Sequence, residues 1–247
     1  MIISLNHANA LGSRTERTLS GGEQGWTTSY FGDSPVRASD GGQEQDGGAQ
    51  AFLVEQSPGS AVLAHFHTQD QFQVVVAGDG TMNRHAIASP AVHYANRHTG
   101  YGPIIAGPGG LSYFTLRAVG ESGANYIPGA MDKLDRKALR RQMTAGVTSI
   151  ALPIDQAPTV EKLMGPTEDG VAAWCVSLLA DQRLPPLEAP TGAGRFIVVL
   201  EGQILLREVL LDPLGVSFVP HTDIGVAMQT RAAGARILVL QLPARNG

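Results

Sequence analysis

Hydrophobic and polar residues alternate along two neighbouring runs between residues 59 and 78. In the first run, alternate positions hold Ala61, Leu63, His65 and His67, with Val62, Ala64 and Phe66 between them. Because successive side chains of a strand point to opposite faces, this run predicts a strand with both histidines on one face. A turn is expected at residues 68–70, and Gln71, Gln73 and Val75 then share one face of a second strand. The two runs predict a strand, a turn and a returning strand.

The rest of the chain consists mainly of short apolar runs separated by glycine and proline. Such runs favour strands where β-branched and aromatic residues are frequent. Further strands are expected at residues 26–31, 51–55, 81–87, 91–95 and 111–117, with a hairpin turn at 78–80 and loops at 39–50 and 96–110. Residues 131–143 are rich in helix formers and predict a helix, and residues 160–164 favour a further short helix.

The second half of the chain repeats the pattern of the first half. Residues 196–202 match 72–78 position for position, residues 216–222 match 92–98, and residues 235–241 match 111–117. A repeat of roughly 125 residues indicates two like domains. The many short runs and turns favour an all-β fold for both.

Composition and charge exclude several classes of function. The 247 residues carry a formal net charge of −4 with a sequence pI near 5.9, so nothing favours nucleic acid or an anionic membrane surface as a partner. The N-terminus lacks the features of a signal peptide, and no run reaches the roughly 18–20 apolar residues of a membrane span. We therefore expect a cytoplasmic protein. Its one cysteine, Cys175, lies in an apolar run and is expected to be a buried thiol rather than a nucleophile.

His65 and His67 are candidate metal ligands. At positions i and i+2 of a strand, their Cα atoms stand roughly 7 Å apart, so both imidazoles can converge on one ion. Gln71, on the returning strand, can offer its amide oxygen to the same ion. The alternative is a pair of histidines inside a barrel that bind nothing.

The spacing of these residues resembles the first motif of the cupin family: Gly, five residues, His-x-His, three or four residues, Glu, six residues, Gly. Here Gly59, His65, His67, Gln71 and Gly78 fit every spacing, with Gln71 in place of the usual Glu. With the repeat, the resemblance implies a bicupin, an all-β chain of two double-stranded β-helix (jelly-roll) barrels. The expected division is an N-terminal segment at 1–39, a first barrel with the metal site at 40–118, a connection with the helix at 119–167, and a second barrel at 168–247.

The second cupin motif contributes a further histidine, and its register in this chain falls on Tyr101. His98 lies three residues earlier and is preferred as the third protein ligand, because imidazole is a far commoner ligand than phenol. Tyr101 is then placed for proton transfer or for a hydrogen bond to substrate. Gln73 shares a face with Gln71 and is expected to support it.

The equivalent positions of the second half do not suit a metal. Ala189, Thr191 and Arg195 align with the two histidines and Gln71, and a cationic Arg195 would repel a metal ion. We expect the second barrel to be a structural copy, and a homodimer is compatible with the sequence.

The resemblance implies an enzyme that uses a divalent transition metal on a small organic molecule in the first barrel. Fe, Mn, Ni and Zn all suit nitrogen and oxygen ligands. An uncharged ligand set leaves about two positive charges on the metal, which favours anionic substrates. A dioxygenase-type oxidoreductase is expected first, with a lyase or isomerase as the alternative. The competing hypothesis is a non-catalytic bicupin that binds a small ligand and has lost its metal site.

Overall fold

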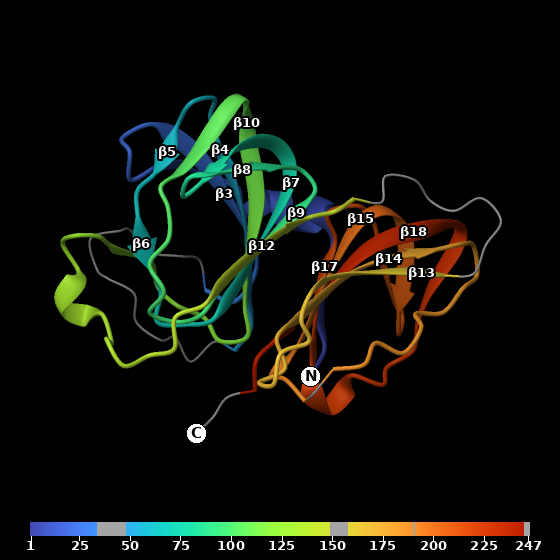
Figure 1. Ribbon diagram of the computed structural model, residues 1–247. Coiled ribbons are helices and arrows are strands. Elements are labelled where there is room, and N and C mark those ends of the chain that lie inside the picture. The colour runs from blue at the N-terminus through green and yellow to red at the C-terminus, as the bar shows by residue number, and fades with distance from the viewer. Residues whose placement is uncertain (34–47, 149–157, 190, 245–247) are drawn as a thin grey trace. The chain divides into compact units, whose positions relative to one another are not determined.

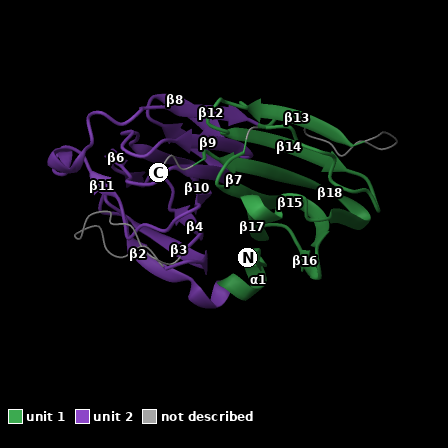
Figure 2. Ribbon diagram, turned by 90° about the horizontal axis from the view of Figure 1, so that it is seen from below, with its two compact units in different colours: residues 1–10, 147–247 green, residues 11–146 purple. Residues whose placement is uncertain are grey.

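The chain folds into two compact units, which Figure 1 colours by residue number and Figure 2 by unit. The computed structural model describes residues 1–33, 48–148, 158–189 and 191–244. The first barrel is Leu11–Gly146, and the second barrel is Met1–Ala10 with Val147–Gly247. Strands make up 55% of the structure and helices 6%, which confirms the expected all-β class.

The first barrel is built from antiparallel strands in the order β12-β9-β7-β10-β4-β3-β2, with β5 on β10, β8 on β7, and β11 paired to β6. Its elements are η1 (Leu11–Ser13), β2 (Thr15–Thr18), β3 (Gln24–Phe31), β4 (Gln50–Gln56), β5 (Ala61–Val62), β6 (His65–Phe66), β7 (Gln71–Met82), β8 (His85–Ala88), β9 (Ala91–Ala95), β10 (Ile104–Arg117), β11 (Asn125–Tyr126), η2 (Met131–Lys133) and β12 (Gln142–Gly146). The expected strands at 26–31, 51–55, 91–95 and 111–117 are therefore present.

The second barrel repeats this order as β1-β17-β15-β18-β14-β13, with β16 on β15. Its elements are β1 (Ile3–Leu5), α1 (His7–Ala10), β13 (Thr159–Met164), β14 (Ala172–Leu178), β15 (Gly194–Leu206), β16 (Val209–Leu211), β17 (Val216–Pro220), η3 (His221–Asp223) and β18 (Met228–Leu242). The internal repeat thus appears as a repeat of strand order, in which β15 corresponds to β7 and β18 to β10.

The barrels take in segments that the expected boundaries left outside them. Strand β1 pairs with β17 and holds the N-terminus in the second barrel, where it takes the position that β12 takes in the first. Strands β2 and β3, before residue 40, belong to the first barrel through the pairing of β3 with β4.

The helix predicted at residues 131–143 is wrong. Only η2 (Met131–Lys133) is helical there, and Gln142 already belongs to β12. The helix predicted at 160–164 is also wrong, because Thr159–Met164 forms β13. Residues 142–143 pair with β9 and β13 pairs with β14, so strand pairing outweighs local helix propensity there. Between residues 134 and 141, the backbone N–H groups of Asp135, Lys137 and Arg141 donate to side chains instead. None of the described helices is long and apolar enough to cross a membrane.

The hairpin turn predicted at residues 78–80 is also wrong, since β7 continues to Met82 and the turn to β8 follows at Asn83. Gly78 instead marks an irregularity in the pairing of β7 with β10 and has a φ of +76°. A side chain at Gly78 would meet the carbonyl oxygen of Gly110, so only glycine fits. The loop predicted at 39–50 lies mostly outside the described residues, and the one at 96–110 ends where β10 begins, at Ile104.

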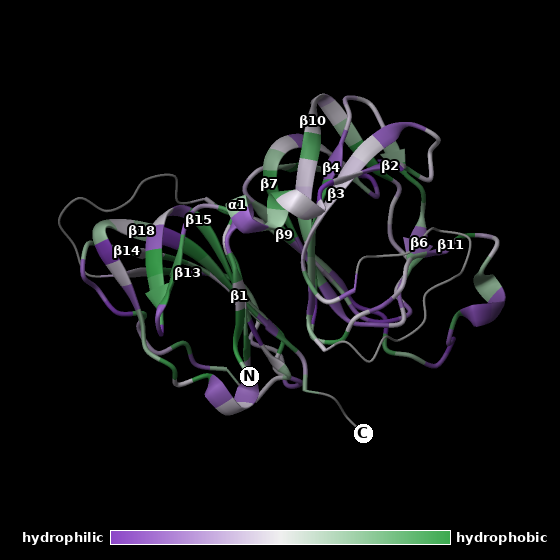
Figure 3. Cartoon of the chain, turned by 180° about the vertical axis from the view of Figure 1, so that it is seen from behind, coloured by the Kyte–Doolittle hydropathy of each residue, from purple (hydrophilic) through white to green (hydrophobic). Residues whose placement is uncertain are grey.

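The strand predicted over residues 61–67 is broken in two. Strand β5 ends at Val62 and β6 begins at His65, with Leu63 and Ala64 in an irregular segment between them. The short strands β6 and β11 carry hydrophilic residues, whereas long hydrophobic stretches run through the strands of the second barrel (Figure 3).

Candidate functional site

His65 and Tyr101 face each other inside the first barrel. The backbone N–H of His65 donates to Tyr101 O at 3.0 Å, and the N–H of Tyr101 donates to His65 O at 2.9 Å. His65 Nδ1 donates to Leu63 O at 2.6 Å, so its Nε2 is the acceptor for the Tyr101 hydroxyl at 2.9 Å. Both residues are only 3% exposed, so the pair is removed from bulk water.

His67 faces the same interior, with its ring centroid 5.0 Å from that of His65. Its Nδ1 lies 3.0 Å from Oε2 of Glu121, and because a carboxylate can only accept, we place the proton on this nitrogen. Oε1 of Glu121 accepts the backbone N–H of Thr68 at 3.0 Å. Glu121 is fully buried, so these contacts hold a charged carboxylate behind His67.

Arg117, the last residue of β10, brings a buried cation to the same cluster. Its Nε and one terminal nitrogen donate to Gln71 Oε1 at 3.0 and 2.8 Å, and its other terminal nitrogen donates to Gln50 Oε1 at 2.7 Å. The nitrogen shared with Gln71 also lies 3.1 and 3.3 Å from the two ring nitrogens of His67. Arg117 Nε is 3.9 Å from the Glu121 carboxylate, so the two buried charges balance.

Gln71 links the cation to the tyrosine. Because a guanidinium only donates, the Gln71 oxygen must face Arg117, and its amide N–H donates to the Tyr101 hydroxyl in a short hydrogen bond. The donors then run in one direction, from Arg117 to Gln71, to Tyr101 and to His65. This chain fixes the orientation of every side chain in it.

The electrostatics keep the histidines neutral and the carboxylate charged. Burial lowers the pKa of His65 to about 3, and burial with the nearby Arg117 cation lowers the pKa of His67. Burial raises the pKa of the Tyr101 phenol, which therefore stays protonated. Burial alone would raise the pKa of Glu121, but contacts with His67 and Arg117 outweigh it and hold this pKa at about 2.

The structure does not bring His98 to this cluster. Its backbone N–H donates to His67 O at 2.6 Å, but its imidazole lies 5.7 Å from the ring of Phe66, whose side chain is on the other face of β6. Nδ1 of His98 accepts the backbone N–H of Asp135 at 3.2 Å. Tyr101 therefore occupies the interior position that the sequence register indicated, and His98 anchors a loop.

A cavity of about 140 Å³ opens beside the cluster in the first barrel. Its polar wall includes His65, His67, Gln73, Tyr101 and Arg117. The rest of its lining is mainly apolar and aromatic: Leu19, Phe52, Val54, Val62, Tyr113 and Tyr126, with Thr27, Thr115, Gly123 and Ala124. We call this cavity the chamber. Gln73 thus lines the chamber, whereas the side chain of Gln71 is held by Arg117 and Tyr101 and not, as expected, by Gln73.

Sequence reasoning missed Arg117 and Glu121. One signal was present in the repeat, since Arg117 aligns with Gln241 while Gln71 aligns with Arg195. When two residue types exchange positions between the halves of a repeat, this indicates that the two residues contact each other. Glu121 follows β10 and carried no comparable signal.

Comparison with solved structures gives the fold. The chain superposes on a putative dioxygenase from Nostoc punctiforme with a TM-score of 0.67 and 10% identity, covering 98% of this chain and 83% of that one. It superposes on bacterial pirin YhhW from Escherichia coli, in complex with nickel(II), with a TM-score of 0.58 and 10% identity over 99% of this chain and 100% of that one. The chain has the cupin fold.

A third cupin neighbour is Bacillus subtilis oxalate decarboxylase, a protein with Mn(II) centres, at a TM-score of 0.59 and 9% identity over 99% of this chain and 78% of that one. No family model matches the sequence, and no curated protein matches it. The likeness therefore rests on the fold, and the two-barrel architecture that the motif and the repeat predicted is confirmed.

The cupin motif implies a divalent metal, and the residues of the first barrel do not fit one. Nε2 of His65 already accepts from Tyr101, and Gln71 Oε1 accepts twice from Arg117. A divalent ion on His67 at about 4 Å from the guanidinium would be repelled by roughly 8 kcal/mol at an effective dielectric of about 20. Among the described residues, no group of three or more His, Cys, Asp or Glu could hold a metal.

The second barrel also has a glutamine–arginine pair, but the two residues have exchanged strands. Arg195 on β15 donates from Nε to Gln241 Oε1 on β18 at 2.8 Å, and its terminal nitrogen donates to Leu187 O at 2.8 Å. In the first barrel, glutamine is on β7 and arginine on β10. Ala189 and Thr191, which align with His65 and His67, offer no imidazole. Cys175 on β14 is buried, and burial raises the pKa of its thiol to about 11, so it is not a nucleophile at neutral pH.

Proposed function

We propose that this bicupin binds a small organic molecule in the chamber of the first barrel, without a metal bound to the protein. The observation that carries the proposal is a cavity lined by a few buried polar side chains together with apolar and aromatic ones. This combination is typical of ligand sites, in which a few polar groups orient a molecule held by apolar contacts.

The size of the chamber limits the ligand. An engineered apolar cavity of roughly 150 Å³ in another protein holds one benzene molecule. The chamber, at about 140 Å³, therefore suits a molecule about the size of a single six-membered ring. Phe52, Tyr113 and Tyr126 offer ring faces and edges for such a molecule to pack against.

The polar cluster supports recognition better than proton transfer. His65 has a pKa of about 3, and burial raises that of Tyr101, so the pair neither gives up nor takes up a proton readily near neutral pH. Arg117 is held by Gln71, Gln50 and His67, so its positive charge is fixed in place. These groups can orient a bound molecule through hydrogen bonds.

The test is a calorimetric titration of chelator-treated protein with toluene and with phenol. We expect saturable binding of at least one probe with a stoichiometry of one. Val54→Phe, which fills the chamber, should abolish binding, while Val160→Phe on the surface of the second barrel should not. Binding of neither probe, or binding that is unchanged in Val54→Phe, would show that the chamber is not a ligand site.

A metal-dependent dioxygenase is the second candidate, and one observation favours it. His65 and His67 are both tied through Nδ1, to Leu63 O and to Glu121, in the manner that orients metal-bound imidazoles through their other nitrogen. The dioxygenase, nickel and manganese assignments of the cupin neighbours agree with this candidate. It requires Arg117 to release Gln71, and bound metal that His65→Ala removes would support it.

A further inference from the structure

Gln73 is a buried polar residue that the cluster around Arg117 does not use. It lies on β7 with an exposed fraction of 2% and lines the chamber, yet its Oε1 has no hydrogen-bond partner in the part of the chain that is described. A buried acceptor without a partner is costly, so its presence calls for a donor from outside the protein.

A second unpartnered atom belongs to the neighbouring strand. His93 on β9 pairs in register with Gln73 and is 1% exposed. Its Nδ1 lies 2.8 Å from Thr144 Oγ1, and its Nε2 has no partner among the described residues. Cross-strand partners project from the same face of a sheet, so Gln73 and His93 lie on one face, but only Gln73 is among the residues that line the chamber. Burial lowers the pKa of His93 to about 4, which leaves it neutral.

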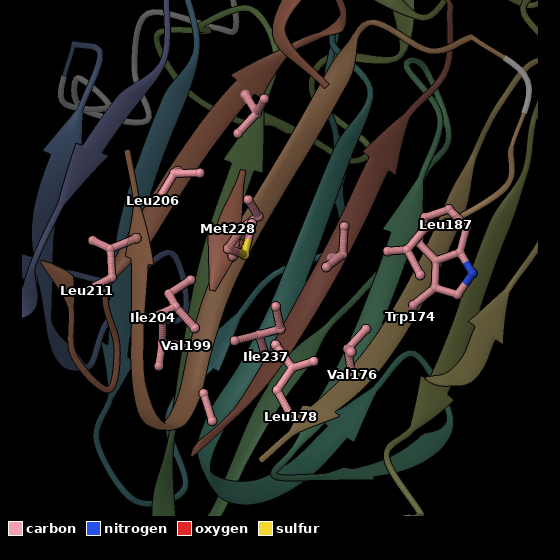
Figure 4. Packing of buried hydrophobic residues seen from close by; sticks show 14 of the residues in the cluster. Trp174, Val176, Leu178, Leu187, Val199, Ile204, Leu206, Leu211, Met228 and Ile237 are labelled. Carbon is pink, nitrogen blue, oxygen red and sulfur yellow. The ribbon is translucent and has the colours of Figure 1, made fainter. Parts of the chain in front are cut away.

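The second barrel shows that the fold does not need a polar residue at the position of Gln73, although Ser217, the counterpart of His93, is polar and buried. Ile197 aligns with Gln73, and it pairs in register with Val239, the counterpart of Thr115. Ile197 and Val239 are both buried in the hydrophobic cluster of that barrel, and Figure 4 shows the side chains of this cluster filling the space between its strands. The same strand arrangement thus forms around an apolar core, so the fold itself does not require the polar Gln73.

The charge of the first barrel limits the ligand further. Arg117 is the cation at the chamber wall, and the Glu121 carboxylate, with its Oε2 3.9 Å from Arg117 Nε, already balances it. An anionic ligand would add an unpaired charge to a buried site, which is unfavourable.

From these observations we infer that the ligand of the chamber is an uncharged, ring-sized molecule that carries a hydroxyl group, and that Gln73 selects it. The hydroxyl donates to Gln73 Oε1, the acceptor in the lining of the chamber to which no described residue donates. This inference rests on the proposed function, because it names the class of molecule that the chamber holds.

The experiment compares three probes of equal ring size: phenol, toluene and benzoate. Phenol gives up the hydrogen bonds of its hydroxyl group to water when it leaves water, and toluene has none to give up. A chamber without a group that binds the hydroxyl therefore prefers toluene. In the wild-type protein we expect phenol to bind at least as tightly as toluene, and benzoate to bind at least a hundredfold more weakly than phenol. In Gln73→Leu, the preference for phenol over toluene should fall by about tenfold or more.

Gln203→Leu on β15 of the second barrel is the matched control and should leave the preference unchanged. Should Gln73→Leu not fold, Gln73→Met is closer in shape and gives the same comparison. A phenol preference that survives the loss of Gln73, or benzoate binding as tight as phenol, would overturn the inference while the proposed function stands. Failure of both phenol and toluene to bind would overturn the proposed function and the inference with it.

Discussion

Replacing Arg117 by methionine should destabilise the first barrel strongly, because it leaves the Glu121 carboxylate buried without its cation. Breaking a buried ion pair by removing one partner typically costs about 3–5 kcal/mol. Arg117→Met also leaves the amide oxygens of Gln71 and Gln50 without the donors that hold them at 2.7–3.0 Å. We therefore expect a loss of at least about 3 kcal/mol in the free energy of unfolding.

Adding Glu121→Gln to Arg117→Met should recover part of this loss, because the uncompensated charge disappears. Contacting residues in one network show coupling energies of about 0.5–3 kcal/mol, and we expect the upper part of this range here. The control is Arg195→Met in the second barrel. Arg195 is partly exposed and donates to a glutamine side chain and a backbone carbonyl, so its replacement should cost less.

Urea unfolding followed by tryptophan fluorescence measures these effects. The chain has two tryptophans, Trp26 in the first barrel and Trp174 in the second. A Trp174→Phe background therefore lets Trp26 report on Arg117→Met, and a Trp26→Phe background lets Trp174 report on Arg195→Met. A loss below about 1 kcal/mol in Arg117→Met, or no recovery with Glu121→Gln, would refute the view that the two residues form one balanced buried pair.

Three further predictions concern the same barrel. Tyr101→Phe removes the hydroxyl between Gln71 and His65 and should cost about 1–3 kcal/mol in urea unfolding, and no loss would show that this link is not formed. The free energy of unfolding should fall on acidification, because His65 and His93, with pKa values of about 3 and 4, stay neutral in the folded protein while the same residues of the unfolded chain bind protons below about pH 6.5. The loss is about 1.4 kcal/mol per pH unit for each residue. His93→Asn should therefore flatten the dependence of the free energy of unfolding on pH between about pH 6 and 4. His98→Asn should leave phenol binding within about twofold, because its imidazole contacts Phe66 and Asp135, and a tenfold loss in the titration would contradict this placement.

The sequence was sufficient for the architecture because each barrel is built from local patterns that recur. The repeat of residues 72–78 at 196–202 lies in two corresponding strands, β7 and β15. The alternation around His65 and His67 yields only the short strands β5 and β6. The segments around residues 131–143 and 160–164 were misassigned because their backbone partners lie outside the local window. Residues 142–143 pair with β9, β13 pairs with β14, and the N–H groups of Asp135 and Arg141 donate to the side chains of His98 and Thr99. Propensity within a window does not contain that information.

The candidate site could be predicted only in part for a related reason. His65, His67 and Gln71 lie within seven residues, and a spacing rule finds them. Arg117 lies 46 residues from Gln71 in the sequence, and the register of β10 on β7 brings the two together. Because Arg117 donates to Gln71, an atom that the motif alone suggests as a metal ligand is already a hydrogen-bond acceptor. A motif search therefore finds the candidate ligands but does not find Arg117, which is distant in the sequence.

The most direct test of this view is a crystal structure of the protein grown with nickel(II), with anomalous data collected at the nickel edge. We expect no anomalous peak between His65 and His67, with the Arg117 guanidinium bonded to Gln71 Oε1 and the Tyr101 hydroxyl bonded to His65 Nε2. An anomalous peak bound by His65 and His67, with Arg117 displaced from Gln71, would contradict the metal-free chamber and establish a metal site instead.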